Sequence, residues 1–502
     1  MSASRPLTRR LLTLCLPALL VGWVEARPGP EKKEDAAPVE VAVVTSHTLE
    51  LNGETLHYTA TAGKLPLLRD GDKPRAEVFY VAYRLVDGPA DRPLTFAFNG
   101  GPGSSSVWLH LGALGPQRVL MGDEGQAPPV PTRYGPNHAS WLGWTDLVFI
   151  DPVSTGYSRA VEGENAHQFH GLNEDVDAVG EFVRLYVTRE GRWSAPKFLA
   201  GESYGTTRAA ALASHLQDRW GMNLNGIALI SPVLDFQTIR FAPGNDQPYW
   251  LFLPTYAATA AYHGKLETSD LAATLREVEA WAVAEYLPAL ALGDALPPER
   301  EARVAETLAR YTGLSTTYVR RSRLRIGMQS FAKELLRDQG YTVGRFDGRY
   351  LGRDALDVGS RPDYDPSYAA VQGAYSAAFN DYARRVLGFE TDRPYEVLTG
   401  AVHPWNYAGV GTNRFVNVAD DLRAAIAKNP ELHVLVACGV YDMATPYFAA
   451  DYTVAHLGLP PERRGNVRVT RYGAGHMMYL RKADLEQLTE DARAFYLRAL
   501  AR

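Results

Sequence analysis

The sequence predicts an α/β fold in which a mostly parallel central sheet is flanked by helices and interrupted by a long, largely helical insertion. Continuous apolar runs of strand length recur between residues 94 and 230 and again between 433 and 470, and such runs are typical of strands buried on both faces. Helical stretches separate the runs, an alternation that indicates a parallel sheet. Residues 236–430 lack this alternation, so we expect one sheet whose two parts are separated by an insertion.

Composition indicates a globular protein. The chain has 502 residues, of which 46% are apolar and 22% are charged, and its formal net charge is −5. Such a chain can bury a large core. No stretch gathers lysine and arginine into a basic stripe, so a nucleic-acid partner is disfavoured.

Residues 1–26 are predicted to be a signal peptide. Arginines at positions 5, 9 and 10 precede an apolar run over 11–23, and Val24-Glu25-Ala26 offers a small-residue cleavage site. The run is short for a membrane span, although an uncleaved anchor helix is the alternative. The adjacent arginines fit twin-arginine export and Sec export alike. Residues 27–40, rich in Pro, Glu and Lys, are a predicted disordered linker.

Cysteine usage bears on the compartment. The chain has only Cys15 and Cys438, and Cys15 would be lost with the signal peptide, which leaves no disulfide. Large secreted eukaryotic enzymes usually carry several disulfides. We therefore expect a bacterial protein that is periplasmic or secreted once the signal peptide is removed, with no membrane contact in its mature form.

Residues 41–235 are the predicted first part of the α/β core. Two-fold alternation over 41–85, with Asn52-Gly53 as a tight turn, predicts antiparallel edge strands. Buried strands are expected at 94–98, 147–150, 197–200 and 227–230, and helices at 174–190 and 206–220.

The predicted insertion covers residues 236–430. It is helical in composition over 269–338 and shows no clear strands over 340–392, and we expect it to form a lid or cap that shapes a substrate pocket. The second part of the core, residues 431–502, has predicted strands at 433–438 and 466–470 and a closing helix over 484–500.

The candidate nucleophile is Ser203, in Gly201-Glu202-Ser203-Tyr204-Gly205 between a predicted strand and a predicted helix. In this setting the pattern is typical of a nucleophile elbow. The turn is so tight that small residues must flank the serine, and it holds the hydroxyl clear of the backbone. An ordinary turn serine is the alternative.

A serine hydroxyl needs a base, and the base needs a carboxylate that orients it. Among twelve histidines, His476 follows a predicted strand in the glycine-flanked loop that begins at Gly473. Asp442 falls in the loop after the preceding strand, and the order serine, acid, histidine is that of α/β-hydrolases. The alternative for Asp442 is a helix cap or a turn residue.

A glycine-rich loop begins at Asn99-Gly100-Gly101 and follows the strand at 94–98. Consecutive glycines let backbone N–H groups approach a ligand, and in lipases one oxyanion donor comes from such a loop while the other follows the nucleophile. These donors would be Gly101 and Tyr204. A phosphate-binding loop is a competing interpretation, but the P-loop lysine is missing; a simple tight turn is another.

Four motifs, in this order along the chain, resemble the serine carboxypeptidase family. They are Asn99-Gly-Gly-Pro-Gly-Ser-Ser-Ser106, Asp151-Pro-Val-Ser-Thr-Gly-Tyr-Ser158, Gly201-Glu-Ser-Tyr-Gly205 and Gly475-His-Met477. The resemblance implies an α/β-hydrolase that removes C-terminal residues from peptides, with Ser203, Asp442 and His476 as its triad. It also implies that Asn99, Gly100 and Glu202 hold the terminal carboxylate of the substrate.

Glu202 fits that role only when it is protonated, because an ionised carboxylate would repel the substrate carboxylate while a neutral one can donate a hydrogen bond. We therefore expect an acidic optimum for peptides. Met477, beside the predicted base, is expected to line a subsite, unless it only packs in the core.

The sequence departs from the family pattern at three points. Ser104 stands where eukaryotic members have a cysteine, Gly205-Thr206 replaces the usual Ala-Gly after the serine, and Ala113 occupies the position of a second carboxylate-binding glutamate in many members. The last departure weakens the expectation of a complete carboxylate site.

The sequence thus predicts an exported serine carboxypeptidase that acts on peptides through an acyl-enzyme and needs no cofactor. No metal is expected, because there is no H-E-x-x-H motif and the histidines are scattered. Two alternatives remain. One is an esterase or acyltransferase on the same scaffold, and the other is a binding protein without turnover.

Overall fold

A computed structural model describes residues 41–69, 73–127 and 130–501, which belong to one compact unit. The predicted signal peptide (1–26) and linker (27–40) lie outside the described residues. Within the described part, no helix has both the length and the apolar character that a bilayer crossing requires.

The centre of the fold is a ten-stranded sheet with the order β1-β2-β3-β7-β4-β9-β10-β13-β14, to which β8 is added by pairing with β3. Strand β3 pairs antiparallel with β2, β7 and β8, and β1 pairs antiparallel with β2. The remaining strands, in the order β7-β4-β9-β10-β13-β14, are parallel to their neighbours. The strands are β1 (Val41–Leu51), β2 (Glu54–Arg69), β3 (Lys73–Leu85), β4 (Leu94–Phe98), β7 (Asp146–Ile150), β8 (Arg159–Ala160), β9 (Lys197–Glu202), β10 (Gly226–Ile230), β13 (His433–Gly439) and β14 (Val467–Tyr472). The predicted α/β fold with a mostly parallel sheet is confirmed.

The edge hairpin forms where the sequence predicts a tight turn. Leu51 pairs with Glu54, so only Asn52 and Gly53 lie between the strands. Both turn residues have positive φ, at 54° and 84°. Asparagine and glycine are the residues that adopt this conformation at least cost.

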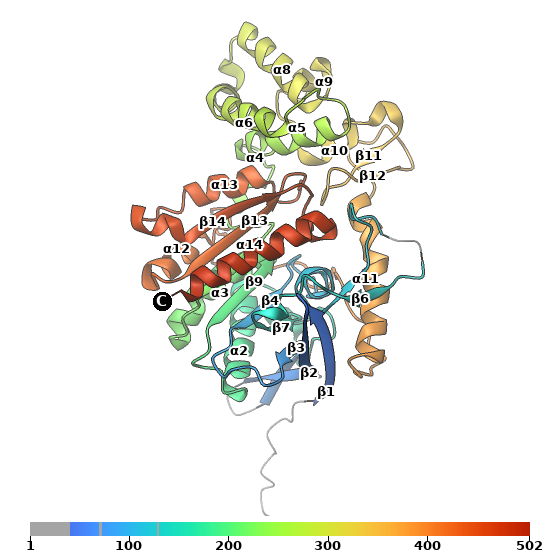
Figure 1. Cartoon of the computed structure of the whole chain (residues 1–502). Coiled ribbons are helices and arrows are strands. Elements are labelled where there is room, and N and C mark those ends of the chain that lie inside the picture. The colour runs from blue at the N-terminus through green and yellow to red at the C-terminus, as the bar shows by residue number, and fades with distance from the viewer. Residues whose placement is uncertain (1–40, 70–72, 128–129, 502) are drawn as a thin grey trace, which may run out of the picture. The chain divides into compact units, whose positions relative to one another are not determined.

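Helices cover both faces of the sheet because its buried strands are apolar on both sides (Figure 1). On β9, Phe198 and Ala200 pack in one core cluster with Phe495 of α14, while Leu199 packs in the other with Val183 of α2 and Leu212 of α3. The flanking helices are α2 (Leu172–Arg189), α3 (Tyr204–Trp220), α12 (Ala419–Lys428), α13 (Tyr447–Ala455) and α14 (Lys482–Leu500). This alternation along one strand ties the two helical layers to a single sheet.

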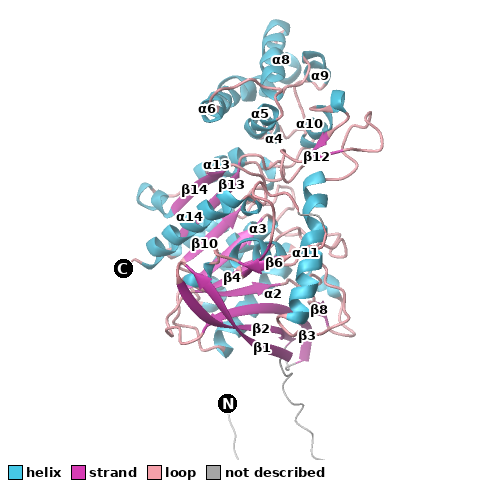
Figure 2. Cartoon of the chain, turned by 45° about the vertical axis from the view of Figure 1, so that its right-hand side comes forward, coloured by secondary structure: helices cyan, strands magenta, loops and turns pink. Residues whose placement is uncertain are grey.

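The insertion contains a helical group with a core of its own, which Figure 2 shows gathered together at the top of the view. Tyr256 and Phe331 stack in this core with ring centroids 4.1 Å apart. The helices are α4 (Gln247–Leu251), α5 (Leu253–Tyr262), α6 (Leu271–Trp281), α7 (Leu287–Leu292), α8 (Pro298–Thr312), α9 (Thr316–Arg321) and α10 (Met328–Glu334). Helical structure over 269–338 is therefore what the composition of this stretch predicts.

The stretch 340–392 differs from its expectation. It holds the two-residue strands β11 (Thr342–Val343) and β12 (Leu351–Gly352) and the long helix α11 (Pro366–Arg385). Val371, Tyr375, Phe379 and Tyr382 of α11 are all buried, and their spacing is helical. Gly373 and the polar residues among them obscured this stripe in the sequence.

Candidate active site

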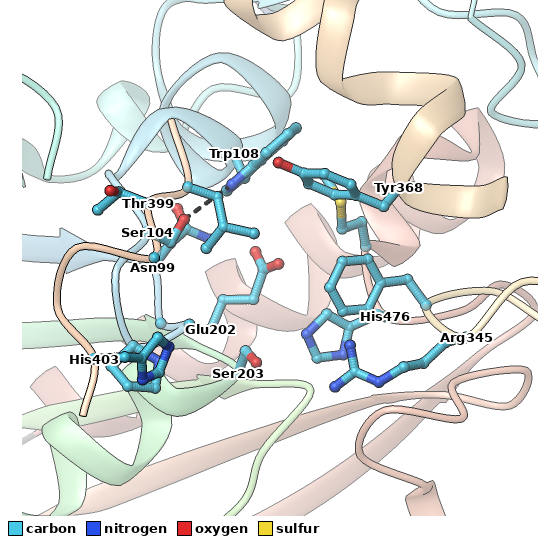
Figure 3. A pocket seen from close by; sticks show the side chains of 17 residues that line it. Asn99, Ser104, Trp108, Glu202, Ser203, Arg345, Tyr368, Thr399, His403 and His476 are labelled. Carbon is cyan, nitrogen blue, oxygen red and sulfur yellow. Dashed lines mark hydrogen bonds between the residues drawn. The ribbon is translucent and has the colours of Figure 1, made fainter. Parts of the chain in front are cut away.

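The candidate residues meet because they follow parallel strands of one sheet. The loop from Asn99 follows β4, Ser203 follows β9, Asp442 follows β13 and His476 follows β14. The carboxyl ends of parallel strands lie at one edge of the sheet, where α/β proteins bind their ligands. A pocket of about 350 Å³ lies there, which we call the serine pocket (Figure 3). Its lining includes Asn99, Gly100, Gly101, Trp108, Glu202, Ser203, Arg345, Phe346, Tyr368, His403, His476 and Met477.

Ser203 sits in a strained turn between β9 and α3. Its φ and ψ are 60° and −130°, a conformation that non-glycine residues rarely adopt. A Cβ atom on Gly201 would lie 2.3 Å from the carbonyl oxygen of Gly205, and one on Gly205 would lie 2.8 Å from the carbonyl oxygen of Phe98. The two glycines of the motif are therefore required by backbone contact.

Asp442 and His476 form a buried pair. Nδ1 of His476 lies 2.7 Å from Oδ2 of Asp442, and both side chains are almost fully buried. The other carboxylate oxygen accepts the backbone N–H groups of Ala444 and Thr445, and the Thr445 hydroxyl donates to Oδ2. These bonds orient the carboxylate, and its contact with the imidazole places the ring proton on Nδ1, which leaves Nε2 free to accept a proton.

The charge of this pair also sets the pKa of the base. Burial alone would lower the pKa of His476, but the neighbouring Asp442 carboxylate and the charge of Glu202 raise it above its ordinary value of 6.5. An imidazolium formed during a reaction would thus be stabilised at this position.

Ser203 and His476 both line the serine pocket, and Figure 3 labels the two side chains there. In the described part of the chain, the Ser203 hydroxyl and Nε2 of His476 are not joined by a hydrogen bond. Ser203 is half-buried, so its hydroxyl is accessible from the pocket. In enzymes without substrate such contacts are often long and tighten when substrate binds.

The glycine loop and the first turn of α3 lie against each other beside Ser203. A Cβ on Gly100 would lie only 2.4 Å from the backbone nitrogen of Tyr204, so the glycine loop touches the first turn of α3. Among the residues that the structure describes, neither the N–H of Gly101 nor that of Tyr204 has a hydrogen-bond partner. Unpaired donors at a helix N-terminus stabilise negative charge.

Glu202 is a buried carboxyl group inside the serine pocket. Burial raises its pKa from 4.5 to about 7, against the opposing effects of the His476 charge and of hydrogen bonds from Tyr479 and Asn99. The Tyr479 hydroxyl lies 2.7 Å from Oε2 of Glu202. Sequence reasoning did not identify Tyr479, although it lies three residues after the predicted base.

Of the other positions singled out in the sequence, some line the serine pocket and others lie in the core. Gly100 and Met477 line the serine pocket. Ala113 is fully buried in the core and is not part of the pocket lining. The Ser104 hydroxyl lies 3.0 Å from Nε1 of Trp108 and accepts its hydrogen bond.

The insertion contributes directly to the site, through the segment 345–348. The carbonyl oxygen of Phe346 accepts the N–H of His476, and that of Arg345 accepts the N–H of Met443, one residue after Asp442. Asp347 accepts the N–H of Gly475 through Oδ2 at 2.9 Å. One short segment therefore joins the loop of the predicted acid to the loop of the predicted base.

Phe346 also packs on the imidazole itself. Its ring is nearly parallel to that of His476, at 9°, with centroids 4.8 Å apart. The guanidinium of Arg345 lies over the Phe346 ring, with its carbon 4.9 Å from the centroid. No sequence signal identified these two residues, because the insertion matches none of the motifs.

Metal binding has no candidate site in the described ranges, where no three His, Cys, Asp or Glu side chains are grouped to hold an ion. Cys438 is a free, buried thiol in β13. The chemistry that this site offers is that of a serine, an imidazole and two carboxyl groups.

Comparison with known proteins supports the same family. Residues 60–247 match the profile of the serine carboxypeptidase family, peptidase S10. The serine carboxypeptidase-like 45 protein of Arabidopsis thaliana is 24% identical over 220 residues, which are 40% of this chain and 45% of that protein. The pheromone-processing carboxypeptidase KEX1 of Yarrowia lipolytica is 30% identical over 167 residues, 33% of this chain and 24% of its own length. The matched part of the chain thus spans less than half the length of each of these relatives.

The fold is matched over a longer stretch. The solved structure of the prohormone-processing carboxypeptidase Kex1 of Saccharomyces cerevisiae superposes with a TM-score of 0.53 and 16% identity, covering 87% of this chain and 91% of that one. That likeness shows the fold. The chain thus has an α/β-hydrolase fold, and its residues 60–247 resemble serine carboxypeptidases.

Proposed function

We propose that the chain is a serine-type carboxypeptidase that removes single residues from the C-terminus of peptides. The observation that carries the proposal is the content of one pocket. It holds a strained serine, a histidine bonded to a buried aspartate, and a buried carboxyl group with a pKa of about 7.

The first step is attack by Ser203 on the carbonyl carbon of the last peptide bond. Nε2 of His476 takes the hydroxyl proton, and Asp442, 2.7 Å from Nδ1, stabilises the imidazolium. The oxygen that becomes negative would accept hydrogen bonds from the backbone N–H groups of Gly101 and Tyr204. His476 then gives its proton to the leaving amine, and an ester to Ser203 remains.

Water hydrolyses this ester in the second step, with His476 again acting as the base. Removing one triad member should cost several orders of magnitude in kcat, because the three side chains act as a unit.

Glu202 and Asn99 would bind the free carboxylate of the leaving residue. A carboxyl group with a pKa of about 7 is largely protonated below that pH, and the protonated form donates a hydrogen bond to the substrate. His476 must be neutral to act as a base, and its pKa is raised. The two requirements give a bell-shaped pH profile with its maximum close to neutrality, and its limits belong to the coupled pair.

The test compares three substrates that share one acyl part, namely a blocked dipeptide acid, its C-terminal amide and its ester. A carboxypeptidase requires the free carboxylate, so kcat/KM for the acid should exceed that for the amide at least tenfold at pH 5 to 6. Equal rates on the acid and the amide would refute carboxylate recognition.

An esterase or acyltransferase is the second candidate, and one observation favours it. The position of the family's second carboxylate-binding glutamate is Ala113, in the core. That candidate predicts rapid turnover of the ester and none of the acid. A binding protein without turnover predicts that a fluorophosphonate probe leaves Ser203 unlabelled in the folded protein.

We also propose that the protein is exported by a bacterium, on the basis of the residue pattern over 1–26 and the single cysteine that would remain. Fractionation of the producing cells, with N-terminal sequencing of the protein, tests this. A periplasmic or secreted protein that starts near residue 27 is expected, and a full-length cytoplasmic protein would contradict it.

A further inference from the structure

A second pocket, of about 240 Å³, opens on the other side of Ser203. We call it the arginine pocket, because two arginines line it and the lining contains no carboxylate. Its lining includes Ser203, Tyr204, Phe236, Arg240, Arg345 and Tyr407. It shares only Gly101, Pro102, Ser203 and Arg345 with the serine pocket.

The guanidinium of Arg345 has no partner of opposite charge. In the described part of the chain, its side chain forms neither a hydrogen bond nor an ion pair. The charges of Asp365 and Asp442 act on the pKa of Arg345, but the oxygens of both carboxylates already accept hydrogen bonds from other groups. Those of Asp442 accept from Ala444, Thr445 and His476. Those of Asp365 accept from the backbone N–H groups of Arg345, Phe346 and Ser367 and from the Ser367 hydroxyl.

Arg240 brings a second positive charge to the same pocket. It is exposed, its guanidinium lies over the Phe236 ring at 5.6 Å, and its polar partner is the neutral hydroxyl of Tyr407. Burial lowers the pKa of Arg345, and the charge of Arg240 lowers it further. The charges of Asp365 and Asp442 act in the opposite direction. Two like charges that face one cavity without an anion favour a ligand that supplies one.

The orientation of a substrate follows from the proposed function, on which this inference rests. The leaving residue lies in the serine pocket with Glu202 and Asn99, and the carbonyl oxygen points to Gly101 and Tyr204. The residue whose carbonyl Ser203 attacks must then extend to the other side of Ser203, into the arginine pocket. We propose that this pocket selects an acidic side chain, aspartate or glutamate, at that residue, and that Arg345 and Arg240 determine the selection.

Three blocked dipeptides with C-terminal phenylalanine test this, with glutamate, glutamine or lysine as the first residue. At pH 5.5 to 6 the glutamate side chain is ionised. The wild-type kcat/KM should be at least about tenfold higher for glutamate than for glutamine, which corresponds to about 1.4 kcal/mol, and lowest for lysine. Equal values for glutamate and glutamine, or a preference for lysine, would overturn the inference while leaving carboxypeptidase activity established.

Variants of the two arginines test whether these side chains cause the preference for glutamate. Arg345→Gln and Arg240→Gln should each reduce the ratio of glutamate to glutamine several-fold, and Arg240→Glu should raise the relative rate on lysine. Because Arg240 is exposed, its replacement does not depend on how the core tolerates change. Arg219→Gln removes an exposed arginine from the far end of α3, fifteen residues after Tyr204 or about 22 Å along the helix, and should keep the wild-type ratio. If Arg240→Gln and Arg345→Gln also keep it, the inference is wrong.

A second substrate pair tests the arginine pocket without any peptide. The mono-4-nitrophenyl ester of adipate differs from 4-nitrophenyl hexanoate only in a carboxylate that replaces the terminal methyl group. The adipate ester should be the better acyl donor, and this preference should fall in Arg345→Gln. If no dipeptide is cleaved but adipate is preferred, the peptidase proposal fails and the anion selection stands. If hexanoate is equal or better, the anion selection fails.

Discussion

Replacing Glu202 with glutamine should change the pH dependence of both stability and activity. Burial raises the Glu202 pKa from 4.5 to about 7 in the folded protein, so the folded state holds this proton more tightly than the unfolded state. The wild-type free energy of unfolding therefore falls as pH rises from about 4.5 to 7, because ionising the buried carboxyl is unfavourable. A shift of this size is worth about 3 kcal/mol.

Glutamine keeps the shape of the side chain but cannot ionise. Relative to the wild type, the Glu202→Gln variant should gain about 3 kcal/mol of unfolding free energy between pH 4.5 and pH 8. Below pH 4.5 the wild-type carboxyl is protonated in both states, so the difference should not vary with pH there. Urea unfolding of both proteins at pH 4, 6 and 8 measures it.

The control is Glu162→Gln, at an exposed position, which should follow the wild-type curve. The activity profile adds a second readout. The alkaline limb on a dipeptide acid, near pH 7 in the wild type, should disappear in Glu202→Gln, and the acidic limb set by His476 should remain. A stability difference that is the same at all three pH values, together with an unchanged alkaline limb, would refute the reasoning.

Three further perturbations test other parts of the site. Asp442→Asn should lower kcat by about four orders of magnitude, because the imidazole loses the partner that fixes its tautomer. Stopped assays of the two enzymes, with the Ser203→Ala rate subtracted as background, measure the ratio of their kcat values. A loss of less than tenfold would contradict the prediction. Phe346→Leu removes the ring that packs on His476. This variant should therefore lower kcat more than it changes KM, and it should shift the acidic limb of the pH profile. A change in KM alone would show that the ring does not position the base. Gly100→Ala should abolish activity, because its methyl group would lie 2.4 Å from the Tyr204 nitrogen. The control Gly373→Ala, at a helix position with open space, should keep activity and raise stability by about 1 kcal/mol. An active Gly100→Ala enzyme would refute the close approach.

Much of the core could be predicted because its signals are local. The run from Leu94 to Phe98 is apolar throughout, as strands buried on both faces are. The Gly201 and Gly205 pattern reports backbone contacts that any side chain would block. A loop after each parallel strand then places Ser203 and His476 at one edge of the sheet without further information.

The rest depends on contacts between distant segments. Arg345 and Phe346 lie about 130 residues before His476 in a segment without a motif. Only the folded insertion brings Phe346 onto the imidazole and Arg345 over the Phe346 ring. Helix α11 was not predicted because Gly373 and the polar residues among its buried aromatic residues obscure the helical spacing. Ala113 occupies the position of a binding residue in the family pattern but lies in the core, within the buried helical turn His110–Leu114.

The most direct test of the central claim follows the products of one peptide with a free C-terminus. Purified protein and its Ser203→Ala variant are incubated with the peptide at pH 5.5, and mass spectrometry records the products with time. We expect the wild type to release residues one at a time from the C-terminus, and we expect the variant to release none. Shortening from the N-terminus, internal cleavage, or equal release by the Ser203→Ala variant would contradict the account.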